Sequence, residues 1–244
     1  MASETQEHPL QGGETLEVTR TLVTDKYGNS THRYALNGGP WQASVTTMGQ
    51  YISGNTFGVA SNWAVKMIRE TGNLDAVKNS NRKAKEDGTA LHEQVNTFIE
   101  DGHVAEENPV FVAWLKTMGH IDFVASERFV YHPKLQYGGT FDAVGIDPRR
   151  GLTLYDWKTK APDSFEKNHG ESHSWLTEQS QLAAYIHALW SMNSAWKPVR
   201  GVVCYIMRDG AYAVERQIDI EQGMRLFVAS RTMHTVIKEI QDEP

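Results

Sequence analysis

The sequence is poor in cysteine and contains no long uninterrupted hydrophobic run. Its single cysteine, Cys204, lies in the apolar stretch GVVCYIM, so it can form no disulfide within the chain and cannot ligate an iron–sulfur cluster by itself. We expect it to be a buried strand residue. No run of about 18 apolar residues could span a bilayer, and the first residues lack the basic flank and apolar stretch of a signal peptide. These absences predict a cytoplasmic protein.

Positive charge is also scarce. The chain has 24 Lys and Arg residues against 30 Asp and Glu residues, a formal charge of −6. This balance argues against a protein that coats nucleic acid through bulk charge. Acidic residues can instead collect metal ions, to which a phosphate then binds. The length of 244 residues, with 40% hydrophobic and 22% charged residues, predicts a soluble globular chain with one elaborated domain.

The chain divides by composition into a polar start and a patterned remainder. Residues 1–16 are polar and lack periodicity, so we expect a mobile tail outside the fold. The remainder, 17–244, is interpreted as a single domain. Its parts are an N-terminal hairpin and helical region at 17–87, a core at 88–215 and a C-terminal helix at 216–244.

Local patterns place helices and strands along that domain. Turn signals at 27–29 and 37–40 predict one or two β-hairpins, and apolar spacing predicts helices at 46–72, at 74–79 and again after Gly88. Leu91, Val95 and Phe98 form one stripe of that last helix, with His92 at its edge. The later elements are strands at 122–132, 135–146 and 152–160, a loop at 161–174, a helix, a hairpin after Pro198 and a helix at 220–240. This order predicts an α/β fold.

Two charged residues lie on the core-facing side of a predicted strand. In Leu152-Thr153-Leu154-Tyr155-Asp156-Trp157-Lys158, alternation directs Asp156 and Lys158 to the same face as Leu152 and Leu154. A carboxylate and an ammonium in such a position are costly to desolvate unless they are paired or bind a metal ion. A surface ion pair is the alternative.

A second acid ends the preceding strand. Asp142 follows Gly138 and Gly139, two residues that would let the backbone run close to a ligand or a neighbouring strand. Asp142 and Asp156 on adjacent strands could hold one divalent cation between them, and such hard oxygen ligands suit Mg²⁺ or Mn²⁺ rather than zinc. A turn aspartate that caps a backbone amide is the alternative for Asp142.

Gln181 and Tyr185 lie four residues apart and therefore share one helix face. Together they present an amide and a phenol. The alternative is that Tyr185 is a core residue whose hydroxyl reaches water.

Four motifs occur in order along the chain: Gly88-Thr89-Ala90-Leu91-His92-Glu93, Gly139-Thr140-Phe141-Asp142, Asp156-Trp157-Lys158-Thr159 and Gln181-Leu182-Ala183-Ala184-Tyr185. Their joint presence resembles the RecB-like branch of the PD-(D/E)XK nucleases, which includes many phage exonucleases. The segments YGGTFDAV, DWKTKAP and QLAAYIHAL look most like the mitochondrial genome maintenance exonucleases. The resemblance covers roughly residues 30–215. It implies a restriction-endonuclease-like core, a mixed central sheet flanked by helices, with an N-terminal β-hairpin and helical extension.

The resemblance implies a metal centre. It makes His92, Asp142 and Asp156 ligands of one or two Mg²⁺ or Mn²⁺ ions, with the carbonyl of Trp157 completing the shell. For His92, a half-buried helix histidine is the alternative. Relatives with a four-cysteine iron–sulfur cluster are excluded, because Cys204 stands alone.

The same resemblance implies roles for four further residues. Lys158 would position or activate the attacking water and neutralise charge on the phosphate, and Gln181 and Tyr185 would steady Lys158 or the DNA backbone. Glu127 is a candidate second-shell or second-metal carboxylate, and a surface glutamate of a strand is the equal alternative.

Local basic residues are needed if DNA is the substrate of a chain with net charge −6. They could follow a phosphate backbone while Trp63 stacks on a base, and a solvated helix face is the alternative. The candidates are Lys66, Arg69, Arg82, Lys83, Lys85, Lys160 and Lys167. By analogy with the mitochondrial enzymes, residues 46–87 could form an arch that admits only a threaded single strand.

These features predict a metal-dependent DNA exonuclease that hydrolyses phosphodiester bonds from DNA ends, with a preference for single strands, in phage or bacterial replication or recombination. One alternative is a double-strand exonuclease that works with a single-strand annealing protein. Another is a non-catalytic DNA-binding protein, which the intact Asp142, Asp156 and Lys158 disfavour. A zinc hydrolase is disfavoured because no H-E-x-x-H pair is present.

Overall fold

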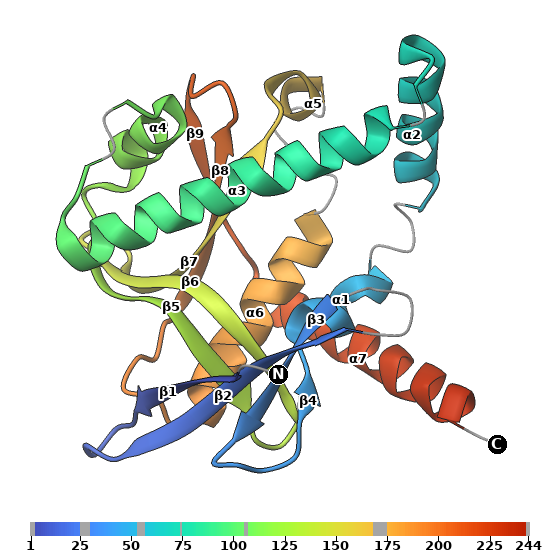
Figure 1. Cartoon of the computed structure of the whole chain (residues 1–244). Helices are drawn as coiled ribbons and strands as arrows, with labels where there is room; N and C mark the ends of the chain where they lie inside the picture. Colours follow the sequence, from blue (N-terminus) through green and yellow to red (C-terminus); the bar gives the residue numbers. More distant parts are fainter. Residues whose placement is uncertain are drawn as a thin grey trace.

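A five-stranded mixed sheet forms the centre of the molecule (Figure 1). The computed structural model describes residues 3–24, 30–52, 57–73, 75–104, 107–167 and 175–242. Sheet order is β5-β6-β7-β8-β9, and only the β7–β8 pair is parallel. The strands are β5 Asp122–His132, β6 Tyr137–Asp147, β7 Gly151–Lys160, β8 Arg200–Met207 and β9 Ala213–Gln217. The predicted mixed sheet flanked by helices is confirmed.

Helices cover both faces of this sheet, and each face has its own apolar cluster. On one face, α3 (Ala76–Asp101) and α4 (Pro109–Met118) pack against the aromatic side chains of Tyr155 and Trp157. On the other face, α6 (Trp175–Ser191), α7 (Ile220–Asp242) and α1 (Val45–Gly49) pack against Leu154 and its neighbours. The alternation expected for β7 is therefore confirmed, with Leu152 and Leu154 on the α6 side.

The parallel β7–β8 pair determines where α6 lies. Parallel neighbours need a long crossover connection, and here it contains α5 (Pro162–Lys167) and α6. The predicted loop at 161–174 thus includes a short helix, and residues 168–174 lie outside the described residues. The crossover lays α6 along the β7 face that carries Asp156.

The N-terminal residues form a second, antiparallel sheet of four strands in place of the expected tail. Its order is β1-β2-β3-β4, with β1 Ser3–Pro9, β2 Thr15–Thr24, β3 Ser30–Leu36 and β4 Gln42–Ala43. The prediction of a mobile tail at 1–16 is wrong for residues 3–16, because all seven residues of β1 pair with β2. The predicted hairpin is confirmed by the β2–β3 pair, although the turn signal at 27–29 lies outside the described residues.

Helix boundaries in the first half also differ from expectation. The predicted helix at 46–72 is two helices, α1 and α2 (Phe57–Thr71). The predicted break before Gly88 is absent, and α3 runs for 26 residues through that glycine. One interior glycine costs only about 1 kcal/mol relative to alanine, which the packing of Leu91 and Val95 offsets. Helix α4 was not predicted; Asn108 caps its N-terminus by accepting from the Val110 and Phe111 amides.

The C-terminal part matches its prediction closely. The hairpin turns at Gly210, which has a positive φ of 73° and donates its amide to the Met207 carbonyl. Cys204 is fully buried in β8 as expected. Among the helices in the described part of the chain, none combines the length and hydropathy needed to cross a bilayer.

Strand β1 is attached to the main body by a buried histidine. His8 is 2% exposed, and its Nε2 lies 2.8 Å from the hydroxyl of Ser194. The ring meets Trp196 edge to face at 5.1 Å, and the Ala195 amide donates to the Pro9 carbonyl. Burial lowers the pKa of His8 to about 4, although a hydrogen bond with the Phe129 backbone opposes this shift.

We expect His8 to make folding stability sensitive to mild acid. Its pKa is near 6.5 in the unfolded chain and about 4 when folded, so its contribution is complete above pH 6.5 and is lost as the pH falls towards 4. At pH 5 the loss is about 2 kcal/mol. Urea unfolding of wild type and His8→Gln at pH 7 and pH 5 measures it. Equal losses in both proteins between the two pH values would exclude His8 as the source.

Candidate active site

His92 reaches the sheet from α3. Its neighbours Leu91 and Val95 are 1% exposed and pack in the cluster that contains Trp157, which orients this helix face towards the sheet. The His92 side chain is 30% exposed. Its Nε2 lies 3.3 Å from the Trp157 carbonyl oxygen, and this contact brings together two groups that the sequence analysis named as ligands.

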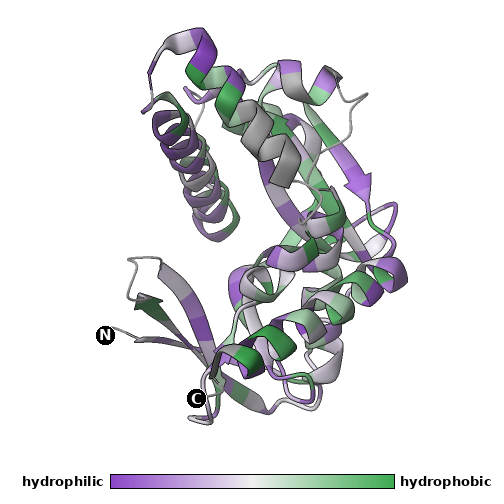
Figure 2. Ribbon diagram, turned by 90° about the vertical axis from the view of Figure 1, so that its right-hand side faces the viewer, coloured by the Kyte–Doolittle hydropathy of each residue, from purple (hydrophilic) through white to green (hydrophobic). Residues whose placement is uncertain are grey.

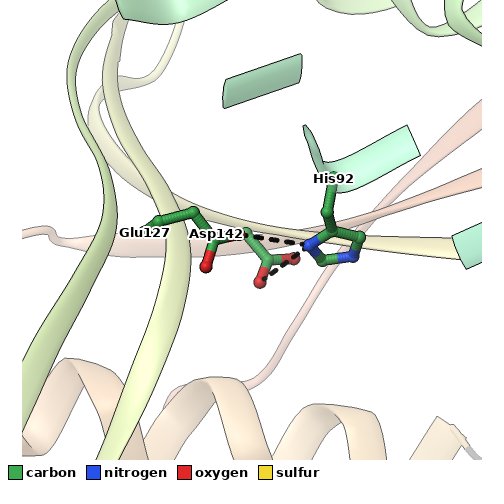
Figure 3. Close-up of side chains that lie close together, drawn as sticks. All are labelled: His92, Glu127 and Asp142. Carbon is green, nitrogen blue, oxygen red and sulfur yellow. Dashed lines mark hydrogen bonds and ion pairs between the residues drawn. The ribbon is translucent and has the colours of Figure 1, made fainter. Parts of the chain in front are cut away.

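Two carboxylates face the other ring nitrogen of His92 (Figure 3). Nδ1 lies 3.3 Å from an oxygen of Glu127 on β5 and 3.7 Å from an oxygen of Asp142 on β6. Burial alone would lower the pKa of His92, but Asp142 and Glu127 outweigh it and raise the pKa to about 9. The three side chains therefore attract one another as a cation between two anions.

Asp142 is held firmly in this position. Its second oxygen accepts a hydrogen bond of 2.7 Å from the Trp157 amide on the neighbouring strand. Burial raises the pKa of Asp142, and the charges of His92 and Lys158 oppose that rise. Asp142 is not the turn aspartate that was the alternative, because it lies within β6; one of its oxygens accepts from a backbone amide of the neighbouring strand, and the other faces His92.

Glu127 has an unusual backbone. Its φ is 47°, in the left-handed region that L residues adopt at a cost. The strand register pairs Ser126 with Ala143 and Arg128 with Phe141, but it does not pair Glu127 with Asp142 between them. The two acids therefore lie opposite each other at a break in the β5–β6 ladder.

Asp156 and Lys158 lie beside this group on β7. Lys158 Nζ is 2.6 Å from Asp156 Oδ2, so the expected pairing of these charges is present. Burial raises the pKa of Asp156 to about 6 despite the opposing charge of Lys158. Burial acts to lower the pKa of Lys158, but Asp156 and Asp142 outweigh it and the pKa is raised. Lys158 is thus held as an ammonium that carries charge and donates hydrogen bonds.

The residues present suit a divalent metal ion. One ligand atom each from His92, Glu127 and Asp142 lie within 4.8 Å of one another, a spacing that a single ion can bridge. Asp156 Oδ1 is buried and accepts no hydrogen bond from the described residues, as expected for an oxygen that a cation would satisfy. The carboxylate oxygens of Glu127 and Asp142 are ligands of the kind that Mg²⁺ or Mn²⁺ prefers, and His92 adds one nitrogen donor.

Gln181 and Tyr185 meet on α6 as predicted, and the amide nitrogen of Gln181 lies 3.1 Å from the Tyr185 hydroxyl. The ring of Tyr185 packs directly on β6, where a Cβ on Gly139 would stand 2.3 Å from its Cε1. Likewise, a Cβ on Gly138 would stand 2.3 Å from the Cβ of Tyr34. The two glycines therefore admit two tyrosine rings against the strand.

The predicted DNA contacts are distributed over α2, α3, β7 and α5. Arg82, Lys83 and Lys85 are exposed on α3, which Figure 2 shows as a largely hydrophilic helix. Lys66 and Arg69 are exposed on α2. Trp63 and Lys167 lie in helices, but their side chains are outside the described residues. Two of these basic side chains form ion pairs with acidic side chains one helical turn away, Lys66 with Glu70 and Arg82 with Glu86, each at 3.6 Å.

Lys160 lies in a pair that the sequence analysis did not foresee. Its Nζ is 2.7 Å from Oε1 of Glu178 on α6, which is 4% exposed. The other oxygen of Glu178 accepts a hydrogen bond of 2.6 Å from the Tyr205 hydroxyl. An isolated acid within the apolar helix WLTEQSQLAAYIHALWS was the available signal for a buried charge.

Gln6 of β1 also escaped prediction. Its amide nitrogen donates to the Glu127 carbonyl at 3.1 Å, and its amide oxygen accepts from the Phe129 amide at 2.8 Å. Arg20 of β2 contacts the same part of β5, because its guanidinium lies 4.5 Å from the centre of the Phe129 ring. The small sheet therefore contacts the strand that carries Glu127.

Comparison with known proteins gives one family. A family model described as "PD-(D/E)XK nuclease superfamily" matches residues 62–243. Solved structures match as well, in 17 chains. One of these is titled "Crystal structure of SSO0001"; it is 19% identical, the alignment covers 70% of each chain, and the TM-score is 0.33. No curated protein matches the chain.

Gly139→Ala tests the close packing of Tyr185 on β6. The added Cβ would lie 2.3 Å from a ring that is only 3% exposed, so the ring or the strand must shift. We expect a loss of about 2 kcal/mol, which lowers Tm by roughly 4–8 °C. Gly49→Ala is the matched control, because its Cβ would meet nothing within 4 Å. Equal melting temperatures for wild type and Gly139→Ala would show that this contact is not tight.

Proposed function

The chain belongs to the PD-(D/E)XK nuclease superfamily, and we propose that it is a Mg²⁺- or Mn²⁺-dependent exonuclease of the RecB-like branch that removes nucleotides from DNA ends. The observation that carries the proposal is the set of His92, Glu127 and Asp142 ligand atoms within 4.8 Å, with the buried Asp156–Lys158 pair on the adjacent strand. Membership of the superfamily supports a nuclease with a divalent metal. The site residues support a hydrolytic role, because none of the acids or Lys158 is replaced.

The proposed division of labour follows from the contacts. A bound divalent ion would lower the pKa of a ligand water and stabilise negative charge on the phosphoryl oxygens. His92, Asp142 and Asp156 would bind the ion. Glu127 would be a further carboxylate ligand, and the Trp157 carbonyl would be an additional oxygen ligand. Asp142 is oriented for this by the Trp157 amide.

Lys158 provides the positive charge that the protein itself contributes. As an ammonium 2.6 Å from Asp156, it can donate to a phosphate oxygen or to the attacking water and stabilise the charge that develops in the transition state. Gln181 and Tyr185 lie on the helix that covers the same face of β7 and would orient Lys158 or the DNA backbone. Their own hydrogen bond limits the rotamers of both side chains.

The exposed basic side chains of α2 and α3 are proposed to bind the DNA backbone. Arg82, Lys83 and Lys85 belong to the same helix as His92, so a strand that binds them leads towards the metal ligands. This supports a single-stranded substrate, which a helix with local charge can contact without enclosing a duplex. A double-strand exonuclease that works with an annealing protein, in phage or bacterial recombination, is the alternative use of the same centre.

Lys158→Ala should abolish nuclease activity. We expect a loss of at least about 100-fold in the rate of digestion of end-labelled DNA, and EDTA should have the same effect. Lys134→Ala is the matched control, because Lys134 is an exposed lysine in the β5–β6 turn. Activity that survives both Lys158→Ala and chelation would place the chemistry elsewhere.

Free ends should be required for digestion. We expect linear single strands to be degraded with Mg²⁺ or Mn²⁺ and circular single strands of the same sequence to remain intact for as long as the linear strand is consumed. Gel analysis of both substrates, with a linear duplex as the third, measures this requirement and the strand preference. Cleavage of the circles at a similar rate would indicate an endonuclease, and preference for the duplex would favour the alternative function.

A further inference from the structure

We propose that Gln6, on the N-terminal strand, is a positioning residue that holds Glu127 in its metal-binding conformation. The inference deepens the proposed function and rests on Glu127 being a ligand of the divalent ion. It begins from three contacts: the Gln6 amide bonds to the Glu127 carbonyl at 3.1 Å and to the Phe129 amide at 2.8 Å, and Glu127 itself lies 3.3 Å from His92.

Strand β5 is an edge strand, and this explains why it needs Gln6. In the order β5-β6-β7-β8-β9 only one side of β5 pairs with another strand of the sheet. In a strand, the backbone groups of residues two apart point to the same edge, as the Glu127 carbonyl and the Phe129 amide do here. An edge of this kind is ordinarily open to water or to another chain.

The Gln6 side chain supplies what a neighbouring peptide group would supply. A primary amide offers one carbonyl acceptor and an NH donor in a plane, and both are used on groups that flank Arg128. Gln6 itself is fixed because β1 pairs with β2 along its whole length, with Gln6 opposite Val18. The contact spans 121 positions of sequence between Gln6 and Glu127.

Gln6 acts at the point where β5 is strained. Glu127 has a φ of 47° and is skipped in the β5–β6 register, so the ladder on its inner side does not hold its backbone. This conformation turns the carboxylate towards Nδ1 of His92 (Figure 3). Without the Gln6 amide, Glu127 would relax towards an extended conformation, in which successive side chains alternate between faces, and its carboxylate would leave the metal ligands.

The test measures Mn²⁺ binding directly by titration calorimetry, with the full-length chain. Gln6→Ala should raise the Mn²⁺ dissociation constant roughly tenfold, the size of effect that supporting residues of metal ligands have. Glu127→Gln should weaken binding at least as much. In the Glu127→Gln background, Gln6→Ala should add no further loss, because both changes act on the same ligand.

Two further variants separate positioning from general stability. Thr5→Ala is the matched control, since it removes the exposed Thr5–Thr19 hydroxyl contact on the same strand and should leave Mn²⁺ affinity within about twofold of wild type. Gln6→Glu keeps an acceptor for the Phe129 amide, which should hold β1 in place. Because it cannot donate to the Glu127 carbonyl, it should still weaken Mn²⁺ binding. Hydrogen exchange at residues 126–129 should increase in both Gln6 variants.

The outcomes distinguish this inference from the proposed function. If wild type binds Mn²⁺ and Glu127→Gln weakens binding, but both Gln6 variants bind as wild type does, Gln6 has no positioning role and the metal centre stands. If Glu127→Gln also binds normally, the inference is wrong because Glu127 is not a ligand. Failure of the wild type to bind Mn²⁺ would instead overturn the proposed function.

Discussion

Most of the structure follows from the burial of two aspartates at the centre of a sheet. Asp142 and Asp156 are 9% and 1% exposed, and carboxylates removed from water in this way are strongly destabilising unless charge or hydrogen bonds compensate. The compensation comes from three directions: His92 on α3, Lys158 on the same strand as Asp156, and the Trp157 amide. Because His92 lies on α3 while Lys158 and Trp157 lie on β7, the positions of α3, β6 and β7 are coupled through charge as well as through apolar packing.

Large aromatic rings pack between α3, α4 and the sheet. Trp114 lies 5.5 Å from Trp157 between ring centres, and Tyr155 stacks on Trp157 at 5.7 Å. Such large buried rings exclude water from below the carboxylates and keep α3 at a fixed height over the sheet. The opposite side belongs to α6 and α7, and its cluster mixes aliphatic side chains with rings such as Tyr137, Tyr185 and Phe227. The site is therefore bordered on one side by rigid rings and on the other by the helix that carries Gln181 and Tyr185.

Sequence patterns predicted the elements whose signal is local. The alternation around Asp156 and Lys158 identified β7 and its polar face. The i to i+4 spacing of Gln181 and Tyr185 predicted that they share one helix face, where the structure adds a hydrogen bond between them. Strand β1 was missed because SETQEHP has no apolar alternation and is mostly exposed. Its place in the sheet comes from pairing with β2. No local pattern could have identified the role of Gln6, whose partners lie more than 100 residues away. The same holds for the ion pair between Lys160 and Glu178, which lie 18 residues apart.

Helix α3 has a further consequence as a rigid spacer. It carries Arg82 and His92 on one uninterrupted helix, and a rise of 1.5 Å per residue separates them along its axis by about 15 Å. In the proposed function, a DNA strand bound at Arg82 would therefore reach the proposed metal ligands a fixed number of nucleotides away. The length of α3 between Arg82 and His92 would then set the distance along the DNA between the binding contact and the cleaved bond.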